Sequence, residues 1–242
     1  MALKILITND DGVTARGIKL LAKWAKQFGE VTVVAPKTEQ SAKSQGIEFT
    51  KSVEIKEVPF MDGVKAYSVD STPADCIRFG VFGLNQKYDL VLSGLNNGEN
   101  VGEDIVYSGT VGAIYESSRY KIPSIAFSTF YDSQDEACKY FDEIYEFIRQ
   151  KNLFENTYML NVNIPANPKG IRVTRQGGNY YSDCFIKTAE ENMYATKGKI
   201  VLSDSPNDLD SDIIAVLNGY ISVTPLAMSR TDLVTFEKHK EK

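Results

Sequence analysis

Apolar and amphipathic segments alternate through the first 150 residues, and this order constrains the fold more than any other feature. Leu3–Ile7 is a short apolar run, and apolar residues then recur at helical spacing from Ile18 to Phe28. The alternation predicts further strands and helices at Val31–Ala35, Ser71–Gly83, Asp89–Ser93, Ser108–Ser118, Ser124–Ser128 and Gln134–Gln150. Strands separated by helices are typical of a parallel sheet with right-handed crossovers. We therefore expect an α/β protein with a Rossmann-like, mostly parallel sheet flanked by helices.

Two glycines are interpreted as the end of a helix and as part of a turn. Gly29 is the expected C-cap of the first helix. Asp62-Gly63 predicts the turn of an antiparallel excursion at the side of the sheet.

The last third of the chain changes character. Met159–Ile164 and Ile171–Thr174 predict strands, and Tyr194–Leu202 predicts a hairpin centred on Lys197-Gly198. A short helix from about Ile213 and a strand at Tyr220–Thr224 follow. Hairpins outside a parallel core suggest an arm, and arms often pack on or exchange with a partner subunit. We expect one domain over residues 1–242, with the parallel core in about 1–150 and core completion plus an oligomerisation arm in about 151–242.

Composition excludes several classes of protein. A net charge of −5 and a pI near 5.1 argue against a general nucleic-acid surface, which would be basic, so we expect no stable nucleic-acid complex. No run is long enough to cross a membrane, and the apolar run after Lys4 is too short for a signal peptide. The cysteines lack metal spacing and suggest reduced thiols in a cytoplasmic protein; they are Cys76, Cys138 and Cys184.

The single histidine excludes further mechanisms. His239 lies in the charged tail, so a Ser-His-Asp triad, a histidine zinc site and phosphohistidine chemistry lack their key residue. The acidic segment Asp204–Asp212 lacks the central glycine and terminal glutamate of an EF-hand, and we expect mainly a solvated loop there.

Thr8-Asn9-Asp10-Asp11-Gly12 stands where the first strand meets the first helix. In open α/β sheets, ligands bind at the carboxyl ends of strands. Two adjacent carboxylates repel each other and favour a hard cation such as Mg²⁺, Mn²⁺ or Ca²⁺. However, Asp-Asp-Gly is also ordinary turn chemistry, and an acidic residue before a helix is ordinary capping, so these residues alone leave both interpretations open.

A second polar stretch follows a later strand. Ser93–Asp104 is rich in glycine and asparagine, and Ser108-Gly109-Thr110 opens a helix whose free N–H groups suit an anion such as phosphate. The alternative is a flexible loop with an ordinary helix cap, although loops of this length in compact domains are usually functional or disordered. Ser41, in the polar loop Lys37–Gly46, is expected on the same rim as Asp10 and Asp11. No Walker A motif and no G-x-G-x-x-G motif is present, which disfavours classical NTPases and dinucleotide dehydrogenases.

Taken together, these stretches resemble the SurE (survival protein E) nucleotidases. The resemblance covers nearly the whole chain and rests on motifs that occur in the family's order. These are Thr8–Gly12, Val34-Ala35-Pro36 with Ser41-Ala42, Thr72–Cys76, Ser93–Asn100, Tyr107–Ala113, Leu160–Pro165, Thr174–Gly177 and Gly219–Pro225.

The resemblance implies a divalent-metal-dependent phosphomonoesterase that hydrolyses nucleoside 5′- and 3′-monophosphates. It implies one Mg²⁺ or Mn²⁺ per subunit, held by Asp10, Asp11, Ser41 and Asn96. Catalytic roles fall on Asp10, Asp11 and Asn9. Substrate or phosphate contacts fall on Asn96, Asn100 and Ser108-Gly109-Thr110, with Asn9 facing the phosphate as well. It also implies a homodimer or homotetramer joined through C-terminal arms.

The loop around Ser41 departs from the family pattern. Gln40 stands where an arginine usually precedes the serine, and Ser44-Gln45 replaces a Gly-His pair. Loss of a cation and an imidazole predicts weaker phosphate binding or an altered substrate preference. Two other functions therefore stay open: a non-catalytic or weakly active nucleotide sensor, and a carboxylate-and-Mg²⁺ phosphatase that forms an aspartyl-phosphate. Direct attack by water is the mechanism we expect.

Overall fold

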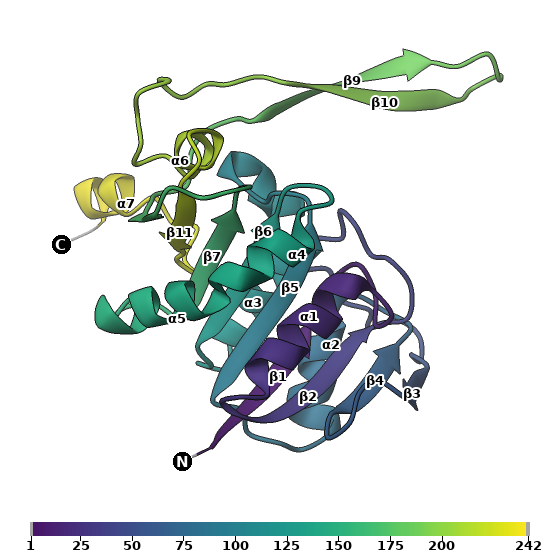
Figure 1. The fold of residues 1–242 in the computed structure, drawn as a ribbon. Coiled ribbons are helices and arrows are strands. Elements are labelled where there is room, and N and C mark those ends of the chain that lie inside the picture. Colours follow the sequence, from purple (N-terminus) through teal and green to yellow (C-terminus); the bar gives the residue numbers. More distant parts are fainter. Residues whose placement is uncertain (1, 241–242) are drawn as a thin grey trace.

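The computed structural model describes residues 2–240. Within them, nine strands form one sheet in the order β3-β4-β2-β1-β5-β6-β7-β11-β8, and β9 and β10 form a separate hairpin (Figure 1). The strands are β1 Leu3–Thr8, β2 Gly29–Pro36, β3 Ile55–Glu57, β4 Lys65–Val69, β5 Leu90–Asn97, β6 Ser124–Thr129, β7 Met159–Ile164, β8 Ile171–Val173, β9 Tyr181–Lys187, β10 Tyr194–Ile200 and β11 Ile221–Pro225. The α-helices are α1 Arg16–Ala25, α2 Pro73–Arg78, α3 Gly109–Ser118, α4 Gln134–Ala137, α5 Phe141–Gln150, α6 Asp212–Leu217 and α7 Leu233–His239.

Strands β4, β2, β1, β5, β6 and β7 run parallel. Strand β3 pairs antiparallel with β4, and β11 pairs antiparallel with β7 but parallel with β8. The last strands, β7, β11 and β8, extend the sheet that the first half begins. The expected mostly parallel α/β fold with a C-terminal hairpin is therefore confirmed. None of the helices in residues 2–240 combines the length and the apolar character that crossing a bilayer requires.

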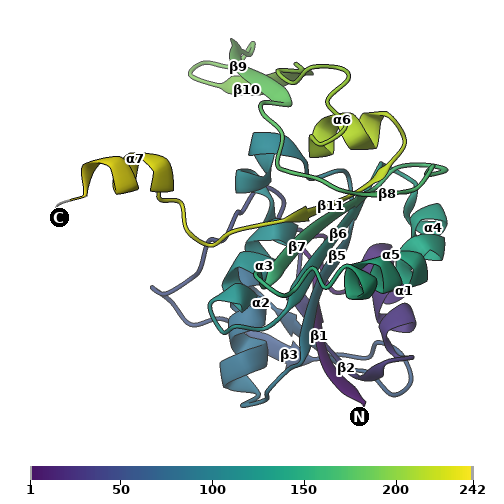
Figure 2. The same ribbon diagram turned by 90° about the vertical axis from the view of Figure 1, so that its left-hand side faces the viewer.

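Helices cover both faces of the sheet. Helices α1 and α5 lie on one face, and α2 and α3 lie on the other (Figure 2). This burial explains the continuous apolar run in β1: Ile5 and Ile7 pack in the α1–α5 core, and Leu6 packs under α2. Because all these parallel strands end at the same edge, the segments that follow them meet there.

Several local expectations were wrong, each for an identifiable reason. Gly29 is the first residue of β2 rather than a helix cap. Glycine is needed there because a Cβ would lie 2.0 Å from the Leu3 carbonyl oxygen on the neighbouring strand. Strand β5 continues to Asn97, four residues into the expected loop, after a register shift between Ser93 and Asn96. The expected helix over residues 134–150 is divided into α4, a 3₁₀ turn at Cys138–Tyr140, and α5.

The C-terminal arm also differs from the expectation in detail. Residues 194–200 form one strand, and β9 pairs with it, so the turn lies in residues 188–193 instead of at Lys197-Gly198. The acidic segment 204–212 is only partly solvated. Its last carboxylate, Asp212, is fully buried and accepts hydrogen bonds from the backbone N–H groups of Gly102, Gly177 and Ile213.

Candidate functional site

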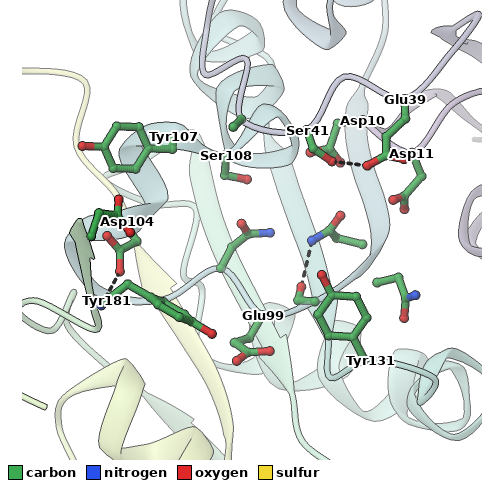
Figure 3. Close-up of a pocket in the computed structure, with 16 residues that line it drawn as sticks. Asp10, Asp11, Glu39, Ser41, Glu99, Asp104, Tyr107, Ser108, Tyr131 and Tyr181 are labelled. Atoms are coloured by element: carbon green, nitrogen blue, oxygen red, sulfur yellow. Dashed lines mark hydrogen bonds between the residues drawn. The ribbon is translucent and has the colours of Figure 1, made fainter. Parts of the chain in front are cut away.

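A cavity of about 580 Å³ opens at the carboxyl ends of the parallel strands (Figure 3). Its walls come from the segments after β1, β2, β5 and β6, from the turn before α3, and from the first residues of β9. The residues that line it are Asp10, Asp11, Glu39, Ser41, Ala42, Asn96, Asn97, Gly98, Glu99, Asn100, Asp104, Tyr107, Ser108, Tyr131, Tyr181 and Asp183. The sheet edge predicted from the sequence is thus where the cavity lies.

Asp10 and Asp11 have different surroundings. Asp10 is 5% exposed, and the Thr110 hydroxyl donates to its Oδ1 over 2.5 Å. Burial raises the pKa of Asp10 despite this hydrogen bond. Burial, and then the charges of Asp10 and Glu39, raise the pKa of Asp11 to about 6. Asp11 Oδ2 is buried and finds no hydrogen-bond partner within residues 2–240.

The start of α3 supports Asp10. Ser108 caps the helix, because its Oγ accepts from the Val111 N–H over 3.1 Å, and it lines the cavity. Gly109 packs against Asp10, where an added Cβ would lie 2.9 Å from the Asp10 Cβ. Thr110 directs both its hydroxyl and its backbone N–H to the Asp10 carboxylate. Gly109 and Thr110 therefore contact the Asp10 carboxylate. Their expected contact with the substrate phosphate stays a prediction.

Asn9 forms its side-chain hydrogen bonds within its own turn. It is fully buried and does not line the cavity. Its Nδ2 donates to the Gly12 carbonyl oxygen over 2.9 Å, and its Oδ1 accepts from the Gly12 N–H over 3.2 Å. The amide is thus used to close the turn that carries Asp10 and Asp11, and its expected contact with phosphate stays a prediction.

Ser41 lies beside the two aspartates on the loop after β2 (Figure 3). Its Oγ donates to Glu39 Oε1 over 2.6 Å. The Gln40 N–H donates to the Asp10 carbonyl oxygen over 2.8 Å, which joins this loop to the aspartate turn. Glu39 was not singled out from the sequence, although it is two residues from Ser41 and raises the pKa values of both aspartates.

The atypical part of this loop packs on α3. The Ser44 Oγ donates to the Val106 carbonyl oxygen over 2.6 Å, and Gln45 Nε2 donates to Glu116 Oε2 over 2.9 Å. At Gly112 of α3, a Cβ would lie 2.2 Å from the Ser44 carbonyl oxygen. The residues that depart from the family pattern therefore fix the loop that carries Ser41.

Asn96 and Asn100 both line the cavity, as expected from the sequence. The Asn96 Nδ2 donates to the Gly98 carbonyl oxygen over 2.8 Å, so its own Oδ1 remains available as a ligand. The Asn100 Nδ2 donates to the Ser128 Oγ over 2.8 Å and keeps a second N–H group.

Several lining residues were missed in the sequence. Glu99 and Asp104 lie within or beside the polar stretch that was recognised, so only their charge could have identified them. Tyr131, Tyr181 and Asp183 carried no local signal, because they reach the cavity from the loop after β6 and from the arm.

The cavity is strongly acidic. Among residues 2–240, six carboxylates line it and no lysine or arginine does; the six are Asp10, Asp11, Glu39, Glu99, Asp104 and Asp183. A bound phosphate ester would add negative charge, and like charges 4 Å apart repel by about 4 kcal/mol at an effective dielectric constant near 20. A cation bound among these carboxylates would offset this repulsion.

The donor set fits a hard divalent cation. Asp10 and Asp11 supply carboxylate oxygens, one of them the buried Asp11 Oδ2, and Ser41 and Asn96 supply neutral oxygens. Residues 2–240 contain no cluster of three or more His, Cys, Asp or Glu side chains arranged for a metal ion. Two carboxylates must consequently be completed by neutral ligands, which suits Mg²⁺ or Mn²⁺ better than Zn²⁺.

Comparisons with known proteins agree with this site. The family model described as "Survival protein SurE" matches residues 5–183. A protein named 5′-nucleotidase SurE from Thermoanaerobacter sp. (strain X514) is 40% identical over 240 residues, covering 95% of this chain and 94% of that protein. The protein of the same name from Clostridium beijerinckii is 40% identical over 245 residues, covering 95% of each. A crystal structure of the SurE protein from Aquifex aeolicus superposes with a TM-score of 0.81 at 36% identity, covering 97% of each chain. With matches over nearly its whole length, the chain belongs to the SurE family.

Proposed function

We propose that this chain is a divalent-metal-dependent phosphomonoesterase that converts nucleoside 5′-monophosphates to nucleosides and phosphate, with activity on 3′-monophosphates as well. The observation that carries the proposal is the pair of buried Asp10 and half-buried Asp11, in a cavity that no lysine or arginine of residues 2–240 lines. Family membership and relatives named 5′-nucleotidase support the same reaction class.

The proposed metal ligands are Asp10, Asp11, Ser41 and Asn96, with one Mg²⁺ or Mn²⁺ per subunit. When bound, such an ion polarises a phosphoryl oxygen and lowers the pKa of water. The Thr110 hydroxyl and the α3 N-terminus hold Asp10 in place. Ser108 and Asn100 offer hydrogen-bond donors to the phosphoryl oxygens from the cavity wall.

The nucleoside fits the opposite part of the cavity. Tyr107, Tyr131 and Tyr181 line it and are 61%, 75% and 44% exposed, so their rings are free to contact a sugar or stack on a base. In the reaction, a water oxygen bonds to phosphorus as the bond from phosphorus to the nucleoside oxygen breaks. The water proton ends on the leaving nucleoside hydroxyl. We propose that water attacks directly, without a phosphoryl-enzyme.

Release of inorganic phosphate from a panel of nucleoside monophosphates tests the proposal. The protein would be stripped of metal and assayed with Mg²⁺, Mn²⁺ or EDTA. Asp10→Asn should lose metal-dependent release, because one carboxylate ligand is gone. Asp62→Asn makes the same chemical change in an exposed turn and should keep it. Equal release by wild type and folded Asp10→Asn would disprove the assignment.

The acid-lined cavity also favours one alternative, a nucleotide sensor. Gln40 stands where the family usually has an arginine, and no lysine or arginine of residues 2–240 lines the cavity. Without such a side chain to stabilise the phosphoryl group, the protein could bind a nucleotide and turn it over only slowly. Calorimetric binding of nucleoside monophosphate without phosphate release would identify this sensor. Acid quenching that traps a phosphoprotein would instead identify the aspartyl-phosphate mechanism.

We propose that the arm joins two or four copies of the chain. The β9–β10 hairpin projects away from the sheet (Figure 1). Alternation and register place Tyr181, Phe185, Tyr194 and Ile200 on one face, all exposed. An isolated two-stranded hairpin is marginally stable in water, so an apolar face of this kind calls for a protein partner.

A further inference from the structure

Two buried asparagines in the middle of the sheet have no part in the functions assigned above. Asn161 and Asn163 lie on β7 and are fully buried. Between and beside them, Leu160, Val162 and Ile164 point to the opposite face and pack in the α1–α5 core. One face of β7 is therefore apolar in the ordinary way, and the other carries two amides toward the α3 side.

Both amides bind one residue of the cavity wall, Asn100. The Nδ2 atoms of Asn161 and Asn163 each donate to the Asn100 carbonyl oxygen over 2.8 Å. The Asn163 Oδ1 also accepts from the Asn100 N–H over 2.8 Å. Asn163 thus holds both backbone polar groups of a residue 63 positions away in the chain.

The side chain of Asn100 is held from the neighbouring strand. Ser128 stands beside Asn163 in the β6–β7 register, and its Oγ accepts from the Asn100 Nδ2 over 2.8 Å. Backbone and side chain are therefore both fixed from the rigid centre of the sheet. Asn100 lies in an irregular segment between β5 and the 3₁₀ turn Gly102–Tyr107, which lacks the support of a strand or helix of its own.

Stability alone does not require amides here. Burying an amide is unfavourable unless it is hydrogen-bonded, whereas valine or leucine would suit a central strand on both faces. Within residues 2–240, the two amides form hydrogen bonds only to Asn100, and Asn161 Oδ1 has no partner there. What these side chains supply is the position of Asn100.

We propose that Asn161 and Asn163 are positioning residues that hold Asn100 so that its amide faces the cavity and contacts the phosphoryl group of the substrate. This inference rests on the proposed function for its substrate. Preorganised donors stabilise a transition state because no reorganisation is needed during the reaction. Misplacement by about 1 Å can reduce the rate about 100-fold.

The test compares Asn163→Ala with Asn100→Ala, with the double variant, and with Ser222→Ala as the matched control. Ser222 is the β11 neighbour of Asn163 and is equally buried, but its hydroxyl has no hydrogen-bond partner in the described part of the chain. We expect Asn163→Ala to lower kcat and kcat/KM together by about 10- to 100-fold, since a transition-state contact is lost. Ser222→Ala should match wild type. The double variant should be no slower than Asn100→Ala, because the two residues act through one contact.

Thermal unfolding shows which variants are folded. If Asn163→Ala does not fold, Asn161→Ala takes its place, since it removes one of the two amides that donate to the Asn100 carbonyl oxygen and leaves Asn163 intact. Wild-type kinetics in the folded variant, or effects of Asn100 and Asn163 that multiply in the double variant, would overturn the inference. If wild type itself releases no phosphate, the proposed function fails. The positioning role is then decided by binding of inorganic phosphate: weaker binding in Asn163→Ala than in Ser222→Ala supports it, and equal binding overturns it.

Discussion

Asp10 and Asp11 are neighbours in the chain, yet only one has its hydrogen bonds satisfied. Asp10 receives the Thr110 hydroxyl, whereas Asp11 keeps a buried oxygen without a partner in residues 2–240. A buried carboxylate oxygen without a hydrogen-bond partner destabilises a fold, so the Asp11 Oδ2 supports the proposed binding role of this residue.

The pKa of Asp11 gives the protein a specific pH dependence. The folded value of about 6 lies above the ordinary 3.8, so the folded state binds the proton more tightly than the unfolded state. Without metal, stability is therefore greatest below about pH 4 for this group and falls as the pH rises to about 6. Asp11→Asn cannot ionise and should unfold at a higher temperature than wild type at pH 7.5, in EDTA. The two should converge near pH 4. Calorimetry at both pH values checks this, and equal melting temperatures at pH 7.5 would refute it.

The support of Asp10 by Thr110 can be tested without touching a ligand. Thr110→Val keeps the shape of the side chain but removes the hydroxyl that orients Asp10. Loss of such a supporting group typically weakens metal binding about 10- to 100-fold, and titration calorimetry with Mn²⁺ measures it. Thr174→Val is the control, since Thr174 is also buried but pairs with Thr224 on the sheet. Equal Mn²⁺ affinity in both variants would show that the hydroxyl has no such role.

Among the elements, α3 and the loop after β2 depend on each other through Gly112. Propensity alone favours alanine over glycine inside a helix by about 1 kcal/mol. Here a Cβ would lie 2.2 Å from the Ser44 carbonyl oxygen, so the loop must move. We expect Gly112→Ala to lower the melting temperature and to lower turnover at least about 10-fold, because Ser41 moves with the loop. Ser118→Ala, at the other end of α3, should do neither. A more stable, fully active Gly112→Ala protein would contradict this.

The strands that the sequence predicted are those in which nearly every side chain is buried. Strands β1, β2, β5, β6 and β7 are apolar runs because helices cover both faces of the sheet. The adjacent positions at their carboxyl ends could be inferred from topology, which explains why Asp10, Asp11 and Ser41 were expected on one rim. Asn96 and Asn100 were singled out within the polar stretch after β5 only by the family resemblance.

Elements formed by long-range contacts were not predictable. Strand β9 is exposed, so its pairing with β10 leaves no burial pattern in the sequence. Gly198 suggested a turn but stands within a strand, where a Cβ would lie 3.0 Å from Asp183 Oδ1. Helix α7 is exposed along its whole length and was likewise missed. The catalytic, phosphate-facing role that the family resemblance implies for Asn9 stays a prediction. The sequence alone could not show that the Asn9 amide is hydrogen-bonded to Gly12.

At the scale of the molecule, the proposed role of the arm is to join copies of the chain. Phe185 is 74% exposed on the aromatic face of the hairpin. Phe185→Glu should shift the protein to monomers, because a charge cannot be buried against a partner without a large penalty. Lys197→Glu, on the opposite face, should leave the oligomer intact. Light scattering after gel filtration measures both, and an unchanged mass for Phe185→Glu would exclude this face as the interface.

The arm and the cavity share residues. Tyr181 and Asp183 line the cavity and belong to the same strand as Phe185, and the Tyr181 N–H donates to Asp104 Oδ2 over 3.0 Å. An arm ordered by a second subunit would thus complete the wall of the site from which it starts. Turnover per subunit would then depend on the concentration of the enzyme. It would fall on dilution, as subunits separate, and would rise again when the protein is concentrated.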